Sequence, residues 1–429
     1  MLRLPALVIL AIATLAMPAS AAAQAQPTPT PTSQLLHRDV LIGADLWDRR
    51  PRMMAAGLGF TNIVGVPGIT TDDLPGSEST VRAVGGAWST VSCAAGETPA
   101  LSAYTSASTP QAVALTFGFP TTLSAGLPVE FSWPIRPSTL DASDFRVTFN
   151  TGETVTPELA AVFPNQEYNE RAVAVLFGKL GNRLPPSDPD AVYPVRTEVV
   201  PDATPLQLVG PHGRLRSAVG MHAETQTTPY DDPANHTGPH LVAAKVSPMS
   251  TRGEGAPKIF AGALPNDGVA LYGSKAQWRL RVYTSGGFSP DGVRGMFPTE
   301  YARYFRVHAR GSGGRDVVLA KTGIDYDIAG DRVRVLGLAD LGRKQSRYDD
   351  CYTEDKDNQI DIVLSGDKAA VRRITAVEIP ASGRYDPFYN PGGPGNAPTP
   401  GTRYTAPGPR QLQKVTQALD DPLTVTLVT

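Results

Sequence analysis

The sequence predicts an all-β protein made of two antiparallel β-sandwich units of immunoglobulin-like type, with long Gly/Pro-rich loops and little helix. Glycine and proline supply 41 and 40 of the 429 residues, well above their usual combined share of about 12%. Turn signals recur about every eight to twelve residues, which is the spacing of a β-sandwich. Between these turns lie short apolar or alternating runs, and both halves of the chain show them.

The first 26 residues have the three-part pattern of a secretory signal peptide. Arg3 precedes an apolar run, and small residues suited to cleavage follow it. We therefore expect an exported protein, secreted or periplasmic. Residues 27–33, PTPTPTS, read as an extended spacer outside the fold.

Residues 34–106 have a mixed pattern and are expected to pack on the core as an N-terminal region. Residues 107–200 are expected to form the first immunoglobulin-like sandwich. The strands predicted there are AVALTFGFP (112–120), PVEFSWPI (128–135), the strand-turn-strand DFRVTFNTGETVTP (144–157) and the buried strand AVAVLFG (172–178).

Residues 201–265 form a loop-rich connection with one predicted hairpin, LQLVGPHGRLRSAVG. Residues 266–429 alternate apolar and polar side chains between Gly or Asp turns, which predicts a second antiparallel β domain. One helix is expected in RQLQKVTQAL (410–419), because its apolar residues recur at helical spacing. The last residues, LTVTLVT, look like a closing strand.

Charge and motifs exclude several classes of function. The formal net charge of −2 with both signs interspersed argues against a nucleic acid or an anionic membrane as partner. After the signal, no apolar run is long enough to span a membrane. The sequence contains no Gly-x-Ser-x-Gly nucleophile elbow, no His-Glu-x-x-His zinc-protease motif and no Gly-x-x-x-x-Gly-Lys-Ser/Thr phosphate-binding loop.

The chain has two cysteines, Cys93 and Cys351. In an exported protein the simplest expectation is one disulfide between them. Such a bond would hold the N-terminal region beside the acidic stretch around Cys351.

That acidic stretch, YDDCYTEDKDNQIDIVLSGD (348–367), is a candidate calcium site through Asp355, Asp357 and Asp361. It is not an EF-hand, because Ile360 stands where the loop needs glycine and Gly366 where it needs glutamate. The alternation after Asn358 predicts a core strand with Asp361 on the opposite face. The alternative, a solvated acidic turn before a strand, stays open.

A ligand site is expected where two loops meet. If 359–365 and 373–379 pair as a hairpin, Asn358 would lie near the segment 383–396. Aromatic faces and polar groups in that segment suit a sugar or a peptide. The expected ligand-binding residues are Asn358, Tyr385, Asp386, Tyr389 and Asn390.

Two weaker candidates concern other chemistry. His236 and His240, with nearby carboxylates, could hold zinc or copper, although Pro233 and Gly238 exclude the helix that this spacing needs. Glu167 and Glu170 could act as a catalytic acid and base in a cleft. Exposed loop histidines and strand-end acids are the plainer alternatives.

These observations favour an exported binding or cell-surface protein that recognises a carbohydrate or another extracellular polymer through loops at one end of the C-terminal sheet. One alternative is an exported polymer-degrading hydrolase or lyase that uses loop carboxylates or a His/Asp metal site. Another is a purely structural envelope protein. Calcium is the cofactor that the residues favour, and the sequence leaves open whether the protein is an enzyme.

Overall fold

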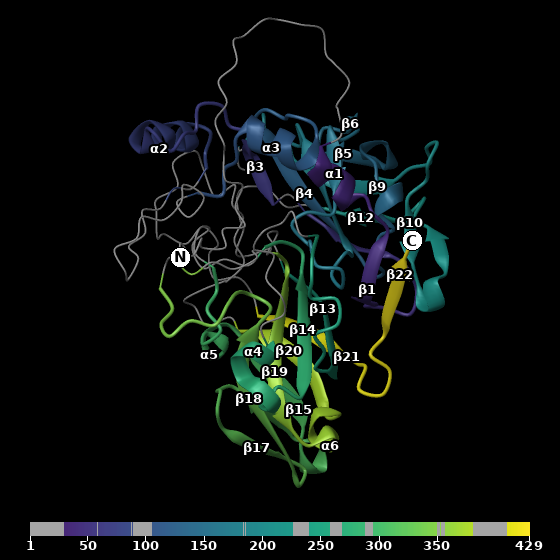
Figure 1. The fold of residues 1–429 in the computed structure, drawn as a ribbon, viewed down its shortest axis with the longest axis vertical. Helices are drawn as coiled ribbons and strands as arrows, with labels where there is room; N and C mark the ends of the chain where they lie inside the picture. The colour runs from purple at the N-terminus through teal and green to yellow at the C-terminus, as the bar shows by residue number, and fades with distance from the viewer. Residues whose placement is uncertain are drawn as a thin grey trace, which may run out of the picture.

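The computed structural model describes residues 30–57, 59–86, 88, 105–182, 184, 186–225, 240–257, 268–287, 295–349, 352, 357–380 and 410–429. The described chain is mostly β, with several sheets and little helix, which confirms the predicted class at this level (Figure 1). Its α-helices are α1 (Pro31–Leu36), α2 (Leu74–Ala83), α3 (Pro110–Phe117), α4 (Gly268–Tyr272), α5 (Tyr301–Tyr304) and α6 (Lys368–Val371). No helix in this part of the chain is long and apolar enough to cross a bilayer.

Two sheets form the N-terminal unit and share one hydrophobic core. Apolar residues of both sheets, such as Leu127, Phe145 and Leu176, are buried together in this core. The five-stranded sheet contains β2 (Met53–Ala56), β4 (Ser124–Phe131), β8 (Val173–Gly178) and β7 (Leu159–Ala161), with β3 (Phe60–Val64) also paired to β4. The four-stranded sheet has the order β12 (His222–Glu224), β9 (Pro194–Val199), β5 (Phe145–Phe149) and β6 (Thr154–Val155).

One nine-stranded sheet forms the C-terminal unit, in the lower half of Figure 1. Leu319 and Ile328, from the two strands at opposite ends of its order, are buried in the same core. The sheet therefore curls around that core. The strand order is β16 (Asp316–Leu319), β15 (Arg306–Arg310), β20 (Ile374–Ile379), β21 (Gln411–Gln417), β13 (Leu241–Pro248), β14 (Trp278–Thr284), β19 (Gln359–Gly366), β18 (Asp331–Ala339) and β17 (Asp325–Ile328).

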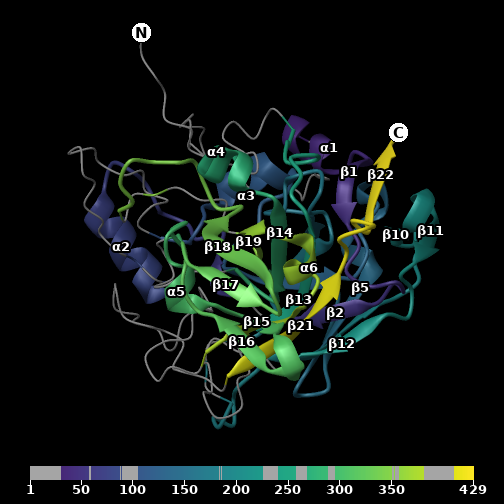
Figure 2. The same ribbon diagram turned by 90° about the horizontal axis from the view of Figure 1, so that it is seen from below.

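Two short ribbons complete the fold. The strand β22 (Thr424–Val428) leaves the C-terminal unit and pairs antiparallel with β1 (Val40–Asp45), so the two ends of the described chain lie side by side (Figures 1 and 2). The strands β10 (Gln207–Val209) and β11 (Leu215–Ser217) form the predicted hairpin. The N-terminal unit is therefore discontinuous, because β22 follows the whole C-terminal sheet, whereas the nine strands of that sheet, β13 to β21, are consecutive in the chain.

Several local predictions are confirmed. All six residues of β8 are buried, as expected for the run AVAVLFG. Strands β5 and β6 form the predicted strand-turn-strand pair. In β19, Ile360, Ile362 and Leu364 point into the C-terminal core, as the alternation requires.

The run AVALTFGFP was predicted as a strand, and this prediction is wrong, because most of it forms α3. Thr109 caps the helix by accepting a hydrogen bond from the backbone N–H of Ala112 at 3.1 Å. Pro110 occupies the first turn, and Gly118 ends the helix with a φ of 81°. These are standard start and stop signals of a helix, and they outweighed the apolar run.

The predicted helix in RQLQKVTQAL is also wrong, because most of this segment forms β21 between β13 and β20. Val415 is buried, but Leu412 on the expected helical face is 55% exposed. Both neighbouring strands hydrogen-bond to this segment. Such tertiary pairing overrides a weak helical period.

The predicted hairpin of 359–365 with 373–379 does not form. Strand β19 pairs with β14 and β18, whereas β20 pairs with β15 and β21. The pairings through β14, β13 and β21 nevertheless make β20 run opposite to β19. The start of β19 and the end of β20 therefore lie at the same end of the sheet, although three strands separate them.

We call this end of the C-terminal sheet the junction end. Strands β13, β19 and β21 begin there, and β14, β18 and β20 end there. Side-chain contacts join these strand ends: Asn358 donates to the backbone carbonyl of Thr284 at 2.7 Å, and the backbone N–H of Leu241 donates to Gln411 at 2.7 Å.

Two intervals of the chain contain more regular structure than the sequence indicated. Residues 31–33, at the end of the segment read as a spacer, begin α1, where Thr30 caps the helix and Pro31 opens it. The interval 201–265 contains β12 and the eight-residue strand β13 in addition to the hairpin. The alternation of β13 is masked by its small residues, LVAAKVSP.

Candidate metal centre at the junction of the two units

The C-terminal sheet has one apolar face and one charged face. Leu280 and Val282 of β14 enter the core, while Arg279 and Arg281, which alternate with them, point the other way. In the adjacent strands Lys245 and Asp361 lie directly beside Arg281. All of these charged residues are buried, because this face packs against the N-terminal unit.

Arg281 is the centre of the resulting charge network. Its guanidinium contacts four carboxylates: Asp361 at 2.8 Å, Asp340 at 2.6 Å, Glu170 at 2.7 Å and Asp45 at 3.3 Å. Asp361 and Asp340 come from the C-terminal unit, whereas Glu170 and Asp45 come from the N-terminal unit. The contacts therefore cross the junction between the units.

Asp45, at the end of β1, is held by three cations. Its carboxylate accepts a hydrogen bond from Lys245 and lies 3.4 Å from a terminal nitrogen of Arg279. Burial alone would raise the pKa of Asp45, but Lys245, Arg279 and Arg281 outweigh it and lower the pKa to about 2. Asp45 is therefore ionised throughout the physiological range.

Beside this network lies a second group of acids, which we call the carboxylate triad: Glu167, Glu170 and Asp357. One carboxylate oxygen from each lies within 4.8 Å of the others. Their exposed fractions are 3%, 1% and 4%. Among the described residues, this is the one group of His, Cys, Asp or Glu side chains with metal-ligand spacing.

The backbone holds the triad in place from several directions. Glu167 and Glu170 lie in the segment before β8, whose carbonyls at Tyr168 and Asn169 accept hydrogen bonds from β1 at 3.0 and 3.1 Å. Asp357 precedes β19 and accepts hydrogen bonds from the backbone N–H of Gln359 at 2.8 Å and from Asn165 at 3.1 Å. The triad is thus assembled across the junction.

Burial shifts the protonation of all three acids in the same direction. It raises the pKa of Glu167 to about 8 and that of Asp357 to about 7, and it raises the pKa of Glu170 well above its ordinary value. Repulsion from neighbouring carboxylates adds to the effect: Glu254 acts on Glu167, and Asp357 acts on Glu170. Without a cation the triad therefore holds protons near neutral pH.

The chemistry that this arrangement supports is ion binding by oxygen. Carboxylates and amide oxygens, with no sulfur or imidazole, are the ligands of hard cations such as Ca²⁺. The triad has almost no exposed surface, so a polymer substrate has no access to it. A closed site with only protein ligands is characteristic of structural metals.

The structure brings together residues that the sequence assigned to different roles. Glu167 and Glu170, the weak catalytic candidates, lie beside Asp357, a calcium candidate. Asp361, another calcium candidate, instead forms an ion pair with Arg281. Asn358 hydrogen-bonds Thr284 and accepts a hydrogen bond from Asn165.

His240 lies at the start of β13, where its backbone N–H donates to the hydroxyl of Ser285 at 2.9 Å. Its sequence partner His236 lies outside the described residues, as do Cys93 and Cys351 of the expected disulfide. The other predicted site residues that lie outside them are Asp355, Tyr385, Asp386, Tyr389 and Asn390.

Sequence reasoning missed most of the network. Arg279 and Arg281 alternate with apolar residues in WRLRVYT, a pattern that reads equally well as a solvated face. The contact of this face with a second unit has no local signal. The network residues that the sequence did not single out are Asp45, Asn165, Lys245, Glu254, Arg279, Arg281 and Asp340.

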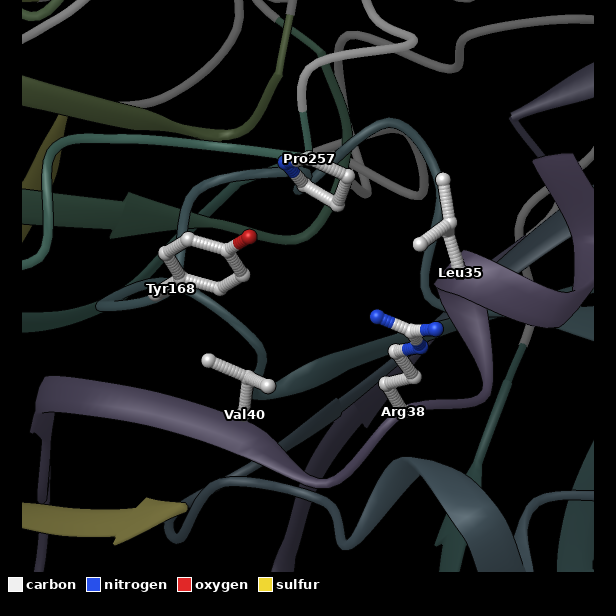
Figure 3. Close-up of a pocket in the computed structure, with 5 residues that line it drawn as sticks. All are labelled: Leu35, Arg38, Val40, Tyr168 and Pro257. Carbon is white, nitrogen blue, oxygen red and sulfur yellow. The ribbon is translucent and has the colours of Figure 1, made fainter. Parts of the chain in front are cut away.

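A pocket of about 290 Å³ lies next to the segment that carries the triad (Figure 3). It is lined by Leu35, Arg38, Val40, Tyr168 and Pro257. Tyr168 separates Glu167 from Asn169 in the chain, and its ring lies 5.1 Å from the guanidinium of Arg171. None of the predicted site residues within the described part of the chain lines this pocket.

No protein-family model matches the chain, and neither a curated protein nor a solved structure is significantly similar to it.

Proposed function

We propose that the protein is an exported, non-catalytic β protein that binds a carbohydrate or another extracellular polymer through segments at the junction end. The observation that carries the choice of binding over catalysis is the burial of Glu167 and Glu170. An acid and a base must reach the substrate. These two carboxylates instead contact the other unit.

The strand directions support the location of the ligand site. The segments 353–356 and 381–409 are bordered by residues 357, 380 and 410. These three residues all lie at the junction end. Binding residues commonly lie on segments that a rigid β scaffold holds at one end. The proposed contacts are Tyr385, Asp386, Tyr389 and Asn390, whose rings and polar groups suit a sugar. Asn358, which the sequence also suggested, is 4% exposed and hydrogen-bonds Thr284 and Asn165, so we leave it out of the proposed contacts.

The finer architecture is part of the proposal. We take the N-terminal unit as an immunoglobulin-like sandwich, and the common core of its two sheets supports this view. The curled nine-stranded sheet is taken as the second unit of this kind. Export rests on the signal-like pattern of residues 1–26, and the absence of a spanning helix in the described part of the chain is compatible with it.

The experiment is a pull-down of the full exported chain on a panel of insoluble polysaccharides and on a glycan array. We expect Tyr385→Ala and Tyr389→Ala to lose most of the retention, because each removes a stacking surface. Tyr193→Ala, which removes a half-buried tyrosine before β9, is the matched control and should bind as the wild type does. Equal retention by all variants would rule out the proposed site.

The same panel tests the alternative of a hydrolase or lyase. Incubation with polysaccharides and esters, with and without EDTA, should release no new reducing ends and no acid. Product formation that Glu167→Gln abolishes would overturn the non-catalytic proposal. Absence of both binding and turnover would leave a purely structural envelope protein.

A further inference from the structure

The network at the junction contains more acidic than basic groups. Among the described residues in it, seven are acids and four are bases, all of them buried. Buried charge of one sign is costly unless something compensates it. The acids are Asp45, Glu167, Glu170, Glu254, Asp340, Asp357 and Asp361, and the bases are Arg171, Lys245, Arg279 and Arg281.

The excess of negative charge is concentrated at the carboxylate triad. Lys245 and Arg279 are engaged with Asp45 and Glu254. Arg281 reaches Glu170 through a single nitrogen at 2.7 Å. Glu170 and Asp357 also hydrogen-bond each other, which requires one of these two carboxyls to carry a proton while no ion is bound.

A second observation, independent of the acids, concerns Asn165. This side chain is fully buried and points at the triad, because its Nδ2 lies 3.1 Å from Oδ2 of Asp357 and 3.0 Å from Oδ1 of Asn358. Its carbonyl oxygen, Oδ1, accepts no hydrogen bond within the described part of the chain. A buried amide oxygen normally has a partner.

The amide of Asn165 can also rotate by half a turn, since its two ends are nearly the same size. Its oxygen would then face Oδ2 of Asp357 and Oδ1 of Asn358. Three converging oxygens repel one another unless a cation lies between them. Asn165 can therefore serve the triad with either end, as a donor to a carboxylate or as a ligand to an ion.

From this geometry we propose that Glu167, Glu170 and Asp357, with the amide oxygen of Asn165, bind one Ca²⁺ that ties the N-terminal unit to the C-terminal sheet. Ca²⁺ accepts about six to eight oxygen ligands with flexible geometry, whereas Mg²⁺ usually keeps several bound water molecules. A site whose four ligands are at most 4% exposed favours the ion that gives up its water. The inference does not depend on polymer binding, because its ligands all lie in the scaffold.

Protons are the competing counter-ions. Carboxyls that lie this close together can be neutralised by protonation instead when no ion is bound. The two cases differ in a measurable way, because calcium binding must displace those protons into the buffer. Proton release on addition of calcium is therefore a signature of this site.

The experiment is calcium titration of the chelator-treated full chain, followed by calorimetry in two buffers of different ionisation enthalpy and by urea unfolding. We expect one ion per chain, with proton release. At a free calcium concentration about 100 times the dissociation constant, the folding equilibrium constant should rise about 100-fold. Mg²⁺ at the same concentration should have a much smaller effect.

Two variants test the ligands. Glu167→Gln and Asp357→Asn should remove most of the calcium response while keeping the shape of each side chain. Asp144→Asn is the matched control, because Asp144 is also a buried acid, with a pKa raised to about 7, but it lies at a turn of the N-terminal unit and accepts hydrogen bonds from Asp141 and Leu206. It should keep the full response.

Calcium binding by the wild-type chain tests the proposed site even if a variant fails to fold. No heat of binding and no change in unfolding on addition of calcium would overturn the proposal. An undiminished calcium response in folded Glu167→Gln and Asp357→Asn would overturn the assignment to the triad.

Discussion

The guanidinium of Arg281 lies between four carboxylates from four parts of the chain: Asp45, Glu170, Asp340 and Asp361. The sequence shows Arg281 only as a polar residue on an alternating strand. Its neighbours across the junction turn a surface position into a buried one with no exposed side chain. A buried charge of this kind is stabilising only while its partners remain.

Arg281→Met should therefore lower the free energy of unfolding by about 3–5 kcal/mol, because several buried acids lose their counter-charge. Urea unfolding of the full chain measures this change. Arg281→Lys should recover part of the loss, since it keeps the charge but not the forked contact with Asp361. Arg334→Met, which breaks an exposed pair with Asp325, should have little effect. Equal effects at positions 281 and 334 would contradict the central role of Arg281.

Stability should also depend on pH through the triad. The pKa values of Glu167 and Asp357 are raised to about 8 and about 7, whereas in the unfolded chain both lie near 4 or so. The folded protein thus holds more protons between about pH 4 and pH 8. Its stability should fall as pH rises through this window.

Urea unfolding in EDTA from about pH 5 to about pH 8 tests this slope. Calcium should weaken the slope because it replaces the protons, and Glu167→Gln should remove part of it. Asp45 adds nothing in this range, since its pKa of about 2 means that its contribution is lost only below about pH 4. A slope of the same size in Glu167→Gln would exclude Glu167 as a source of it.

At the scale of elements, capping signals proved more informative than apolar runs. Thr109, Pro110 and Gly118 mark α3 at both ends, and these residues are visible in the sequence. The strand β21 had no comparable signal, because its place between β13 and β20 is a property of distant segments. Local chemistry could have predicted α3, but not β21.

The last strand, β22, should contribute to stability through one face only. Val425 is 4% exposed in the N-terminal core, and Val428 is 63% exposed. Val425→Ala should lower the free energy of unfolding by about 1–3 kcal/mol, because it leaves a cavity in the core. Thermal or urea unfolding should show almost no change for Val428→Ala. Similar losses in both variants would mean that β22 does not lie on β1 in this register.

At the scale of the whole molecule, the chain passes from the N-terminal unit to the C-terminal unit and back again. Strand β12 of the N-terminal unit is followed in the chain by β13 of the C-terminal sheet, and β22 returns to pair with β1. Lys245 of the C-terminal unit also donates to the backbone carbonyls of Pro422 and Leu423 at 3.1 Å. The units are therefore joined by two chain connections and by side-chain hydrogen bonds as well as by ion pairs.

We expect the two units to unfold in one cooperative transition, since the N-terminal unit is completed by β22, which follows the C-terminal sheet, and both units lose partners when they separate. Differential scanning calorimetry should show a single peak whose calorimetric and van't Hoff enthalpies agree. Two resolved peaks in the wild-type chain would contradict this expectation. Arg281→Met, which weakens the junction alone, is the variant in which two peaks should first appear.

The sequence by itself determined strands such as β8 and β19, because the period of two and the Gly, Pro and Asp turns act within a few residues, but it took α3 for a strand and β21 for a helix. It placed Ile360, Ile362 and Leu364 in a core and Asp361 on the opposite face, and the structure confirms this. It also singled out Glu167 and Glu170 as a possible acid and base pair, and Asp357 separately as a calcium ligand. The burial of the charged face of the C-terminal sheet could not be predicted from the sequence. A strand that alternates apolar and charged residues has the same pattern whether its charged face is solvated or covered by another unit.

Only the tertiary structure decided which strands pair and which acids meet. The order of the nine-stranded sheet separates β19 from β20 and brings Asp357 to Glu170, which lies 187 residues earlier in the chain. Pairing over such distances depends on the balance between burial and chain entropy in the whole fold. The carboxylate triad exists because that balance buries two charged surfaces against each other.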